Sequence, residues 1–163
     1  MSTPSPFGIQ SGTSFRFLRQ MINGEHDLEN DTLFFAMYST LAFIEPQTVD
    51  DQASITGELV GNGYTAGGEQ LTQSVIYTPG GEDRPAIDFV DLTFGPGATW
   101  GIGPSNPDAA QGAVIYNTTA GPQQNKVIWL INFGSPISVN NGTFIVRWPD
   151  PTDPTLAIVR TTG

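Results

Sequence analysis

The fold is decided by one stretch of the chain, VIWLINF at residues 127–133, in which every second residue from Val127 to Phe133 is large and apolar. The run TFIVRW at residues 143–148 repeats this alternation from Phe144 onward. Successive side chains of a strand point to opposite faces of a sheet, so both runs are typical of half-buried strands with one apolar face. Between the two runs, Ser-Pro and Asn-Asn-Gly favour a turn.

Strand-like runs continue towards both ends of the chain. Residues 32–38 (TLFFAMY) are apolar on both parities, which predicts a central strand covered on both faces. In residues 86–94 the apolar parity changes halfway, which predicts a bulge near Val90 and Asp91. Shorter candidates are Gly57–Val60, Leu71–Tyr77, Ala113–Tyr116 and Leu156–Arg160. About eight strands in all predict a mainly β protein, a single β-sandwich of the jelly-roll or immunoglobulin-like type.

The N-terminal end differs from the rest of the chain. Residues 1–12 are rich in Ser, Thr, Pro and Gly, with Phe7 and Ile9 as apolar anchors. We interpret them as an extended arm, and a disordered terminus is the alternative. A short helix is predicted over residues 14–23, because apolar residues recur there at spacings of three and four and Asn-Gly closes the run. The sandwich domain is predicted to cover residues 13–163, helix included.

The composition argues against several functional classes. The 163 residues contain no cysteine, which excludes disulfides, thiolate metal sites and cysteine nucleophiles. A formal charge of −10 at pH 7 repels a phosphate backbone, so we expect no nucleic-acid binding. No apolar run approaches the roughly 20 residues of a membrane span, and the N-terminus shows no signal pattern. We therefore expect no membrane contact and synthesis in a cytosol.

Charge is distributed unevenly along the chain. Residues 1–24 contain Arg16 and Arg19 and no acidic residue, whereas the other 139 residues carry a formal charge of −12. A basic end on an acidic body indicates that the end docks where the body does not.

The candidate chemical sites are weak. His26 is the only histidine, and no nucleophile-elbow sequence accompanies it, so a catalytic triad is not expected. The acidic residues in Glu25–Asp31 suit a hard cation, but the spacing of an EF-hand is absent, and we interpret the segment as a solvated turn. The glycines of residues 61–68 lack the lysine and the following helix of a phosphate loop, and they favour turns.

Glycosidases require a pair of carboxylates, for which the candidates are Glu82, Asp83, Asp88 and Asp91. Glu82 and Asp83 lie in a sequence typical of a hairpin tip, and Asp88 lies on the polar parity of its strand. We therefore expect no catalytic residue, no cofactor and no metal.

The order of the motifs along residues 14–160 carries a resemblance. The series is the helix, HDL at 26–28, DTLFFAMYS at 31–39, the glycine segment, ATW at 98–100, GAVIYN at 112–117, LINFG at 130–134, GTFIVRWP at 142–149 and AIVR at 157–160. In this order it is similar to small virion structural proteins of tailed phages, some described as capsid decoration or cement proteins and others as tail-fibre proteins. The resemblance implies a β-sandwich subunit, self-association and attachment to the outer face of a capsid, without catalytic residues.

One functional expectation follows, with two alternatives. We expect a non-enzymatic virion protein that cements the capsid surface, contacts the major capsid protein and forms a homo-oligomer, a trimer in preference to a dimer. The residues expected at the capsid interface are Phe7, Ile9, Arg16 and Arg19. A tail or fibre component that binds a host surface is the first alternative, with Trp100 as its candidate exposed aromatic residue. A small hydrolase is the second.

Overall fold

The computed structural model describes residues 12–39, 49–77, 86–102, 108–148 and 159–160. These residues form one α-helix, one short 3-10 helix and ten strands, three of which are only two residues long. The elements are β1 (Gly12–Thr13), α1 (Phe15–Ile22), β2 (Leu33–Tyr38), η1 (Gln52–Ser54), β3 (Glu69–Gln70), β4 (Gln73–Tyr77), β5 (Ala86–Phe89), β6 (Leu92–Trp100), β7 (Ala110–Asn117), β8 (Val127–Ile137), β9 (Val139–Val146) and β10 (Val159–Arg160).

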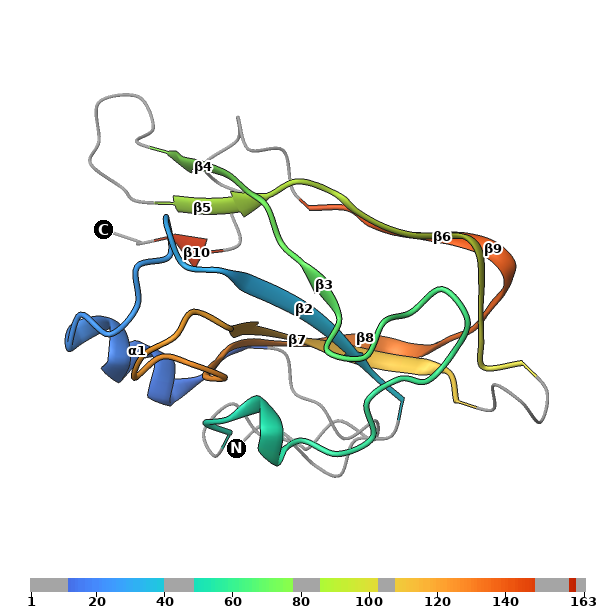
Figure 1. The fold of residues 1–163 in the computed structure, drawn as a ribbon, viewed down its shortest axis with the longest axis horizontal. Helices are drawn as coiled ribbons and strands as arrows, with labels where there is room; N and C mark the ends of the chain where they lie inside the picture. Colours follow the sequence, from blue (N-terminus) through green and yellow to red (C-terminus); the bar gives the residue numbers. More distant parts are fainter. Residues whose placement is uncertain (1–11, 40–48, 78–85, 103–107, 149–158, 161–163) are drawn as a thin grey trace.

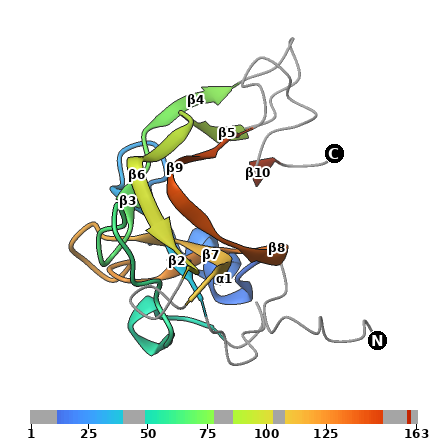
Figure 2. The same cartoon turned by 90° about the vertical axis from the view of Figure 1, so that its right-hand side faces the viewer.

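The strands form three antiparallel sheets arranged in two layers (Figures 1 and 2). One layer is a five-stranded sheet with the order β1-β8-β7-β2-β3, and the other consists of β10-β5-β4 and β6-β9. Apolar side chains from both layers share one core, to which β2 contributes Phe35, β7 contributes Ile115 and β6 contributes Phe94 and Trp100. The prediction of a mainly β, sandwich-like fold is therefore confirmed.

Strand β2 lies between β7 and β3 and is buried on both faces, as its sequence predicts. Phe35 and Met37 point into the core between the layers. Ala36 and Tyr38 point to the opposite face, where a second apolar cluster is covered by the segment that contains η1. The helix α1 and the segment after it lie at one end of this sheet, at the left of Figure 1.

The alternation in β8 is interrupted by a bulge. Tyr116 of β7 pairs with Val127, and Ile115 pairs with Trp129, so that Ile128 is an extra residue. Val127 therefore joins the second cluster, while Ile128 and Trp129 face the first. The prediction that Val127 and Trp129 share a face is wrong, because the bulge shifts the register between them.

The bulge predicted near Val90 and Asp91 is also wrong. Strand β5 ends at Phe89 and pairs with β4, whereas β6 begins at Leu92 and pairs with β9. The parity of the apolar residues changes because the chain passes from one sheet to another, and both Phe89 and Phe94 are buried.

The turn residues between the two alternating runs lie within strands. Ser135-Pro136 belongs to β8, Asn140-Asn141-Gly142 belongs to β9, and the strands are separated only by Ser138. The register is irregular at both places. In β8, Asn132 pairs with Gly112 but Ile137 pairs with Ala110, so extra residues lie between them. In β9, Gly142 pairs with Ala98 but Val139 pairs with Trp100. These residues therefore mark bulges, where the missing N–H of proline and a left-handed Asn141 are tolerated.

One predicted strand is shorter than expected, and another is described only in part. In Gly57–Val60 only Glu58 forms a bridge, to Tyr38. The last strand, β10, covers Val159–Arg160, and residues 156–158 lie outside the described residues. The glycine segment at 61–68 forms turns as predicted, and Gly68 (φ +84°) lies so close to the carbonyl of Phe35 that a Cβ does not fit there.

Candidate partner interface

The helix α1 has one inward and one outward face. Ser14 precedes it as its N-cap residue, and Asn23 and Gly24 (φ +69°) end it, as predicted. Phe17 and Gln20 are the buried residues of the helix. With about 100° between successive residues, residues 15 and 22 lie opposite these two, and residues 18 and 19 lie on either side of that direction.

The outward face of α1 is apolar. Phe15 is 58% exposed, Leu18 is 50% exposed and Ile22 is 86% exposed, and Met21 flanks them. We call Phe15, Leu18 and Ile22 the α1 ridge. The sequence correctly places these residues on one face of a helix, and the structure shows that this face is turned away from the core. An apolar surface of this kind is typical of a contact with another molecule.

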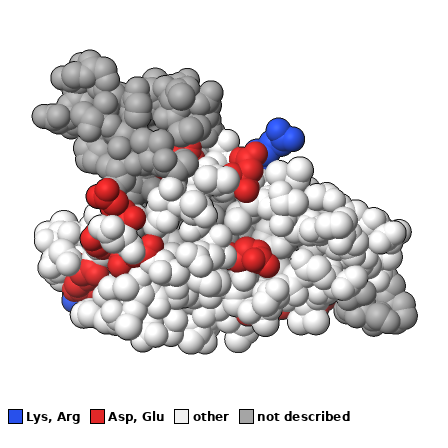
Figure 3. All heavy atoms as spheres, turned by 45° about the horizontal axis from the view of Figure 1, so that its top comes forward, with Lys and Arg blue, Asp and Glu red and all other residues white. Residues whose placement is uncertain are grey.

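Basic residues lie on α1 between the ridge residues, and acidic residues follow the helix in the chain. Arg16 and Arg19 are exposed on the helix itself. The guanidinium of Arg16 lies 3.6 Å from the carboxylate of Asp50, a largely exposed ion pair that contributes little. Glu25, Asp27 and Glu29 follow the helix, and acidic side chains gather at this end of the molecule (Figure 3, left).

The start of α1 is fixed to the five-stranded sheet. The Ser14 hydroxyl does not cap the helix; it donates a hydrogen bond of 3.0 Å to the carbonyl of Val49. The Ser14 N–H donates to the carbonyl of Ile128 in β8, also at 3.0 Å. The helix is therefore anchored to the edge of the sheet and to the segment that covers its second face.

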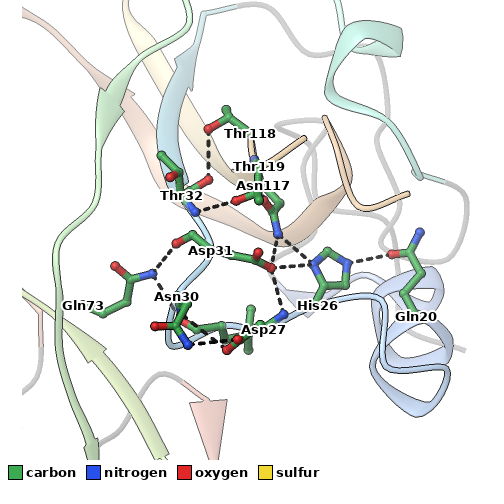
Figure 4. A network of polar contacts seen from close by, with 11 residues as sticks. Gln20, His26, Asp27, Asn30, Asp31, Thr32, Gln73, Asn117, Thr118 and Thr119 are labelled. Carbon is green, nitrogen blue, oxygen red and sulfur yellow. Dashed lines mark hydrogen bonds and ion pairs between the residues drawn. The ribbon is translucent and has the colours of Figure 1, made fainter. Parts of the chain in front are cut away.

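A buried polar network lies beneath the inner face of α1 (Figure 4). The side-chain amide of Asn117 donates to Asp31 Oδ2 at 2.6 Å and to His26 Nδ1 at 3.0 Å. Asp31 Oδ2 also accepts the N–H of Asp27 at 2.9 Å. The second ring nitrogen of His26, Nε2, lies 3.2 Å from Gln20 Oε1. The network thus connects α1, the segment after it and the end of β7.

Neighbouring hydrogen bonds extend this network into the sheet. Asn117 Oδ1 accepts the N–H of Thr119, and the Thr119 hydroxyl accepts the N–H of Thr32 at 2.7 Å. The side chain of Gln73, from the other layer, donates to the carbonyls of Leu28 and Asp31. All of these contacts are internal, so they fix the position of residues 25–31.

The network determines the protonation of His26. An amide nitrogen only donates, so Nδ1 must accept from Asn117, and the ring proton lies on Nε2 and is donated to Gln20. Burial lowers the pKa of His26 below its usual value of 6.5, an effect that the negative charges of Asp31 and Glu25 oppose. His26 is therefore neutral near pH 7, and its Nδ1 lies 3.9 Å from Asp31 Oδ2 without forming an ion pair.

The interpretation of Glu25–Asp31 as a solvated turn is wrong for part of the segment. His26, Leu28 and Asp31 are buried, whereas Asp27 and Glu29 are exposed. The apolar Leu28 shares its parity with His26, which is the signal in the sequence that would have placed the histidine inside. Nothing in the sequence pairs it with Asn117, which is 91 residues away.

The other sequence candidates are also placed by the structure. Trp100 is fully buried in the core, so the prediction that it is an exposed host-binding aromatic is wrong. Asp88 is buried too, contrary to its expected polar face, and its Oδ1 accepts the N–H of Phe89 at 2.8 Å. Asp91 accepts the N–H of Trp148 at 3.1 Å. Phe7, Ile9, Glu82 and Asp83 lie outside the described residues.

The described residues contain neither a candidate metal cluster nor a membrane-spanning helix. Their histidine, aspartate and glutamate side chains form no group of three or more that is able to hold a metal ion. None of their helices has the length and apolar character required to cross a membrane. Comparison with known proteins gives no significant match to a protein-family model, a curated protein or a solved structure.

Proposed function

We propose that this chain is a non-enzymatic structural protein of a tailed-phage virion, which decorates the outer face of the capsid and stabilises it. The order of its motifs supports this proposal, together with the sandwich-like fold that the resemblance implies. The observation that carries it is the outward face of α1, because an exposed apolar ridge with two arginines is typical of a subunit that contacts other subunits of an assembly, its own copies included. The partner is the major capsid protein, and the location is the capsid surface.

The internal use of the polar residues favours a structural role over a hydrolase. A catalytic histidine needs a ring nitrogen that reaches the substrate. Both ring nitrogens of His26 are engaged by Asn117 and Gln20, and the ring is buried. Asp91 holds the backbone at the end of β9. Each of these candidate catalytic groups thus has a structural function in the described residues.

The N-terminal segment is the proposed attachment to the capsid. Residues 1–11 precede β1, which pairs with β8 at the same sheet edge that anchors α1. Phe7 and Ile9 each contribute about 1.5–3 kcal/mol if they become fully buried on a partner. Ordering the backbone costs about 1–2 kcal/mol per residue, so a single copy binds weakly and several linked copies bind much more tightly.

The experiment measures how much protein binds to capsids from which the decoration has been removed. Wild-type protein should occupy them in a saturable manner. Deletion of residues 1–11, the double variant F7A/I9A and the double variant R16E/R19E should each weaken binding by about tenfold or more. Arg147→Glu provides a control, because it reverses the charge of a single arginine at an exposed site next to β9.

Occupancy is quantified by gel densitometry and by electron microscopy of the capsids. Undiminished occupancy with all three variants would contradict attachment through the N-terminal segment. Binding of the wild-type protein to host cells, with none to capsids, would replace the proposal by the tail or fibre alternative. That alternative has lost its candidate residue, because Trp100 is buried.

A further inference from the structure

The α1 ridge differs from the other exposed apolar residues of the described chain. The structure has eight large exposed apolar side chains, and four of them, the ridge and Met21, lie on α1. The other four lie singly on separate segments: Val60, Val90, Ile102 and Ile145. Single exposed apolar residues are ordinary on a protein surface, whereas a continuous group indicates a contact. The ridge therefore requires a specific occupant.

The charges beside the ridge identify that occupant. The helix carries two arginines and no acidic residue, and the segment directly after it carries Glu25, Asp27 and Glu29. Arg19 has no ion pair with any described residue of its own chain. The helix is thus apolar and basic, and acidic residues follow at its C-terminal end. Two antiparallel copies therefore bring unlike charges together at each end of the contact, as a two-fold contact between identical chains requires.

We propose that the α1 ridge packs against the α1 ridge of a second copy of this chain, with the two helices antiparallel across a two-fold axis. The register that covers the whole ridge places Phe15 opposite Ile22 of the second copy and Leu18 beside its symmetry mate. This contact removes the most exposed apolar side chains of α1 from water.

The antiparallel arrangement also pairs the charges. Side chains of a helix lean towards its N-terminus. Arg16 therefore extends beyond the ridge, at the level where the segment after the helix of the second copy begins with Glu25. Arg19 reaches the C-terminal end of the second helix, where a positive charge is favourable. A parallel arrangement would instead bring the arginines of the copies together.

This inference does not depend on attachment to a capsid, because self-association is measured on the isolated protein. It favours a dimer over the trimer expected from the sequence. Two copies joined in this way carry two N-terminal segments, which provides the linked attachment that the proposed function needs. A protein that dimerises without binding capsids would leave the inference intact and contradict only the proposed function.

The first experiment is sedimentation velocity on the full chain over a range of concentrations. The wild-type protein should be a dimer at about 100 µM. The double variant L18D/I22D should raise the dissociation constant by about 100-fold or more with an unchanged circular dichroism spectrum. Val60→Asp, at another exposed apolar site, should leave the dimer unchanged.

The charge pattern is tested by reversal. The variant R16E/R19E and the variant E25K/E29K should each weaken the dimer, because like charges then face each other across the axis. Combining all four substitutions in one chain should restore most of the affinity. Restoration is specific for a contact in which the basic side of one copy meets the acidic side of the other.

Single cysteines define the orientation, because the natural chain has none. Leu18→Cys should form a disulfide-linked dimer under mild oxidation. Phe15→Cys alone should not, because the two sites are about 10 Å apart along antiparallel helices. A mixture of Phe15→Cys and Ile22→Cys should give the linked heterodimer, and Val60→Cys serves as the unlinked control.

Three results would overturn the inference. The first is a wild-type protein that stays monomeric at about 100 µM. The second is a dimer that L18D/I22D does not weaken. The third is efficient linkage of Phe15→Cys with itself in a trimer, which would indicate parallel helices around a three-fold axis. If the ridge is instead covered by the capsid, the isolated protein is monomeric and L18D/I22D abolishes capsid binding.

Discussion

The sandwich core buries apolar side chains, whereas the α1 end of the molecule buries mainly polar ones and exposes several apolar ones. In the core, Phe35 and Trp100 are fully buried between the two layers. At the α1 end, the ridge points to solvent, while Gln20, His26 and Asn117 are buried beneath the helix. The core is stabilised by the hydrophobic effect, and this interaction has no preferred direction. The helix is held by Phe17, which joins the core, and by hydrogen bonds, which do have a preferred direction.

This difference assigns two properties to two regions of one chain: the core provides stability, and the α1 end provides a surface for recognition. An apolar core tolerates a range of side-chain arrangements, whereas a buried polar network is stable only if each member has its partner. Because α1 is anchored through Phe17, Gln20 and Ser14, the apolar residues of the ridge stay available for another protein. Substitutions in the two regions should therefore differ in which property they change, and by how much.

The largest loss of stability is expected in the core. Trp100 is fully buried and contacts the rings of Phe94 and Phe144. Trp100→Ala should lower the free energy of unfolding by about 3–5 kcal/mol, because the lost burial is combined with a cavity. Urea denaturation measures the change, and Ile145→Ala, at an exposed site on β9, is the control. A loss below about 1 kcal/mol would contradict the assignment of Trp100 to the core.

The core is also the part of the molecule that could be predicted from the sequence. Burial on both faces makes β2 a continuous apolar run, and the alternation from Phe144 onward follows the two faces of β9. Bulges and changes of sheet were not predicted correctly, since a turn-forming sequence such as Asn-Asn-Gly fits a loop and a bulge equally well. Pairing between distant strands decides which of the two forms.

The α1 site could be predicted only in part. The spacing of Phe15, Leu18 and Ile22 identifies one face of a helix, but the same spacing occurs on helices that pack inward. Its direction depends on the contacts of Gln20 with His26 and of His26 with Asn117, which come from three separate segments. Local sequence contains no information about such long-range hydrogen bonds.

A smaller loss of stability is expected in the polar network. Asn117→Ala removes the donor to His26 Nδ1 and Asp31 Oδ2 and the acceptor for the N–H of Thr119. Leaving buried polar groups without partners should cost about 2–3 kcal/mol. Asn140→Ala, at an exposed position on β9, should change the free energy of unfolding by less than about 0.5 kcal/mol. Equal effects of the two substitutions would show that the network does not stabilise the fold.

The network should also make stability depend on pH. His26 has a lowered pKa in the folded protein, so below pH 6.5 the unfolded chain takes up a proton that the folded chain resists. The free energy of unfolding should therefore fall as the pH falls from 6.5 towards the pKa of the folded state, and His26→Gln should remove this part of the dependence. Urea titrations of both proteins at several pH values measure it, and identical pH profiles would contradict the buried, neutral histidine.

The smallest change in stability is expected on the ridge, although this is where the largest change in association is expected. Ile22 is the most exposed large apolar residue of α1 and contributes little to the folded monomer. At concentrations where the protein is monomeric, Ile22→Ser should change the free energy of unfolding by less than about 0.5 kcal/mol, as should Val60→Ser. At higher concentrations only Ile22→Ser should lower the melting temperature relative to the wild type, because a dimer stabilises the folded state by mass action. A loss of several kcal/mol in the monomer would instead place Ile22 in the core and remove the contrast between the two regions.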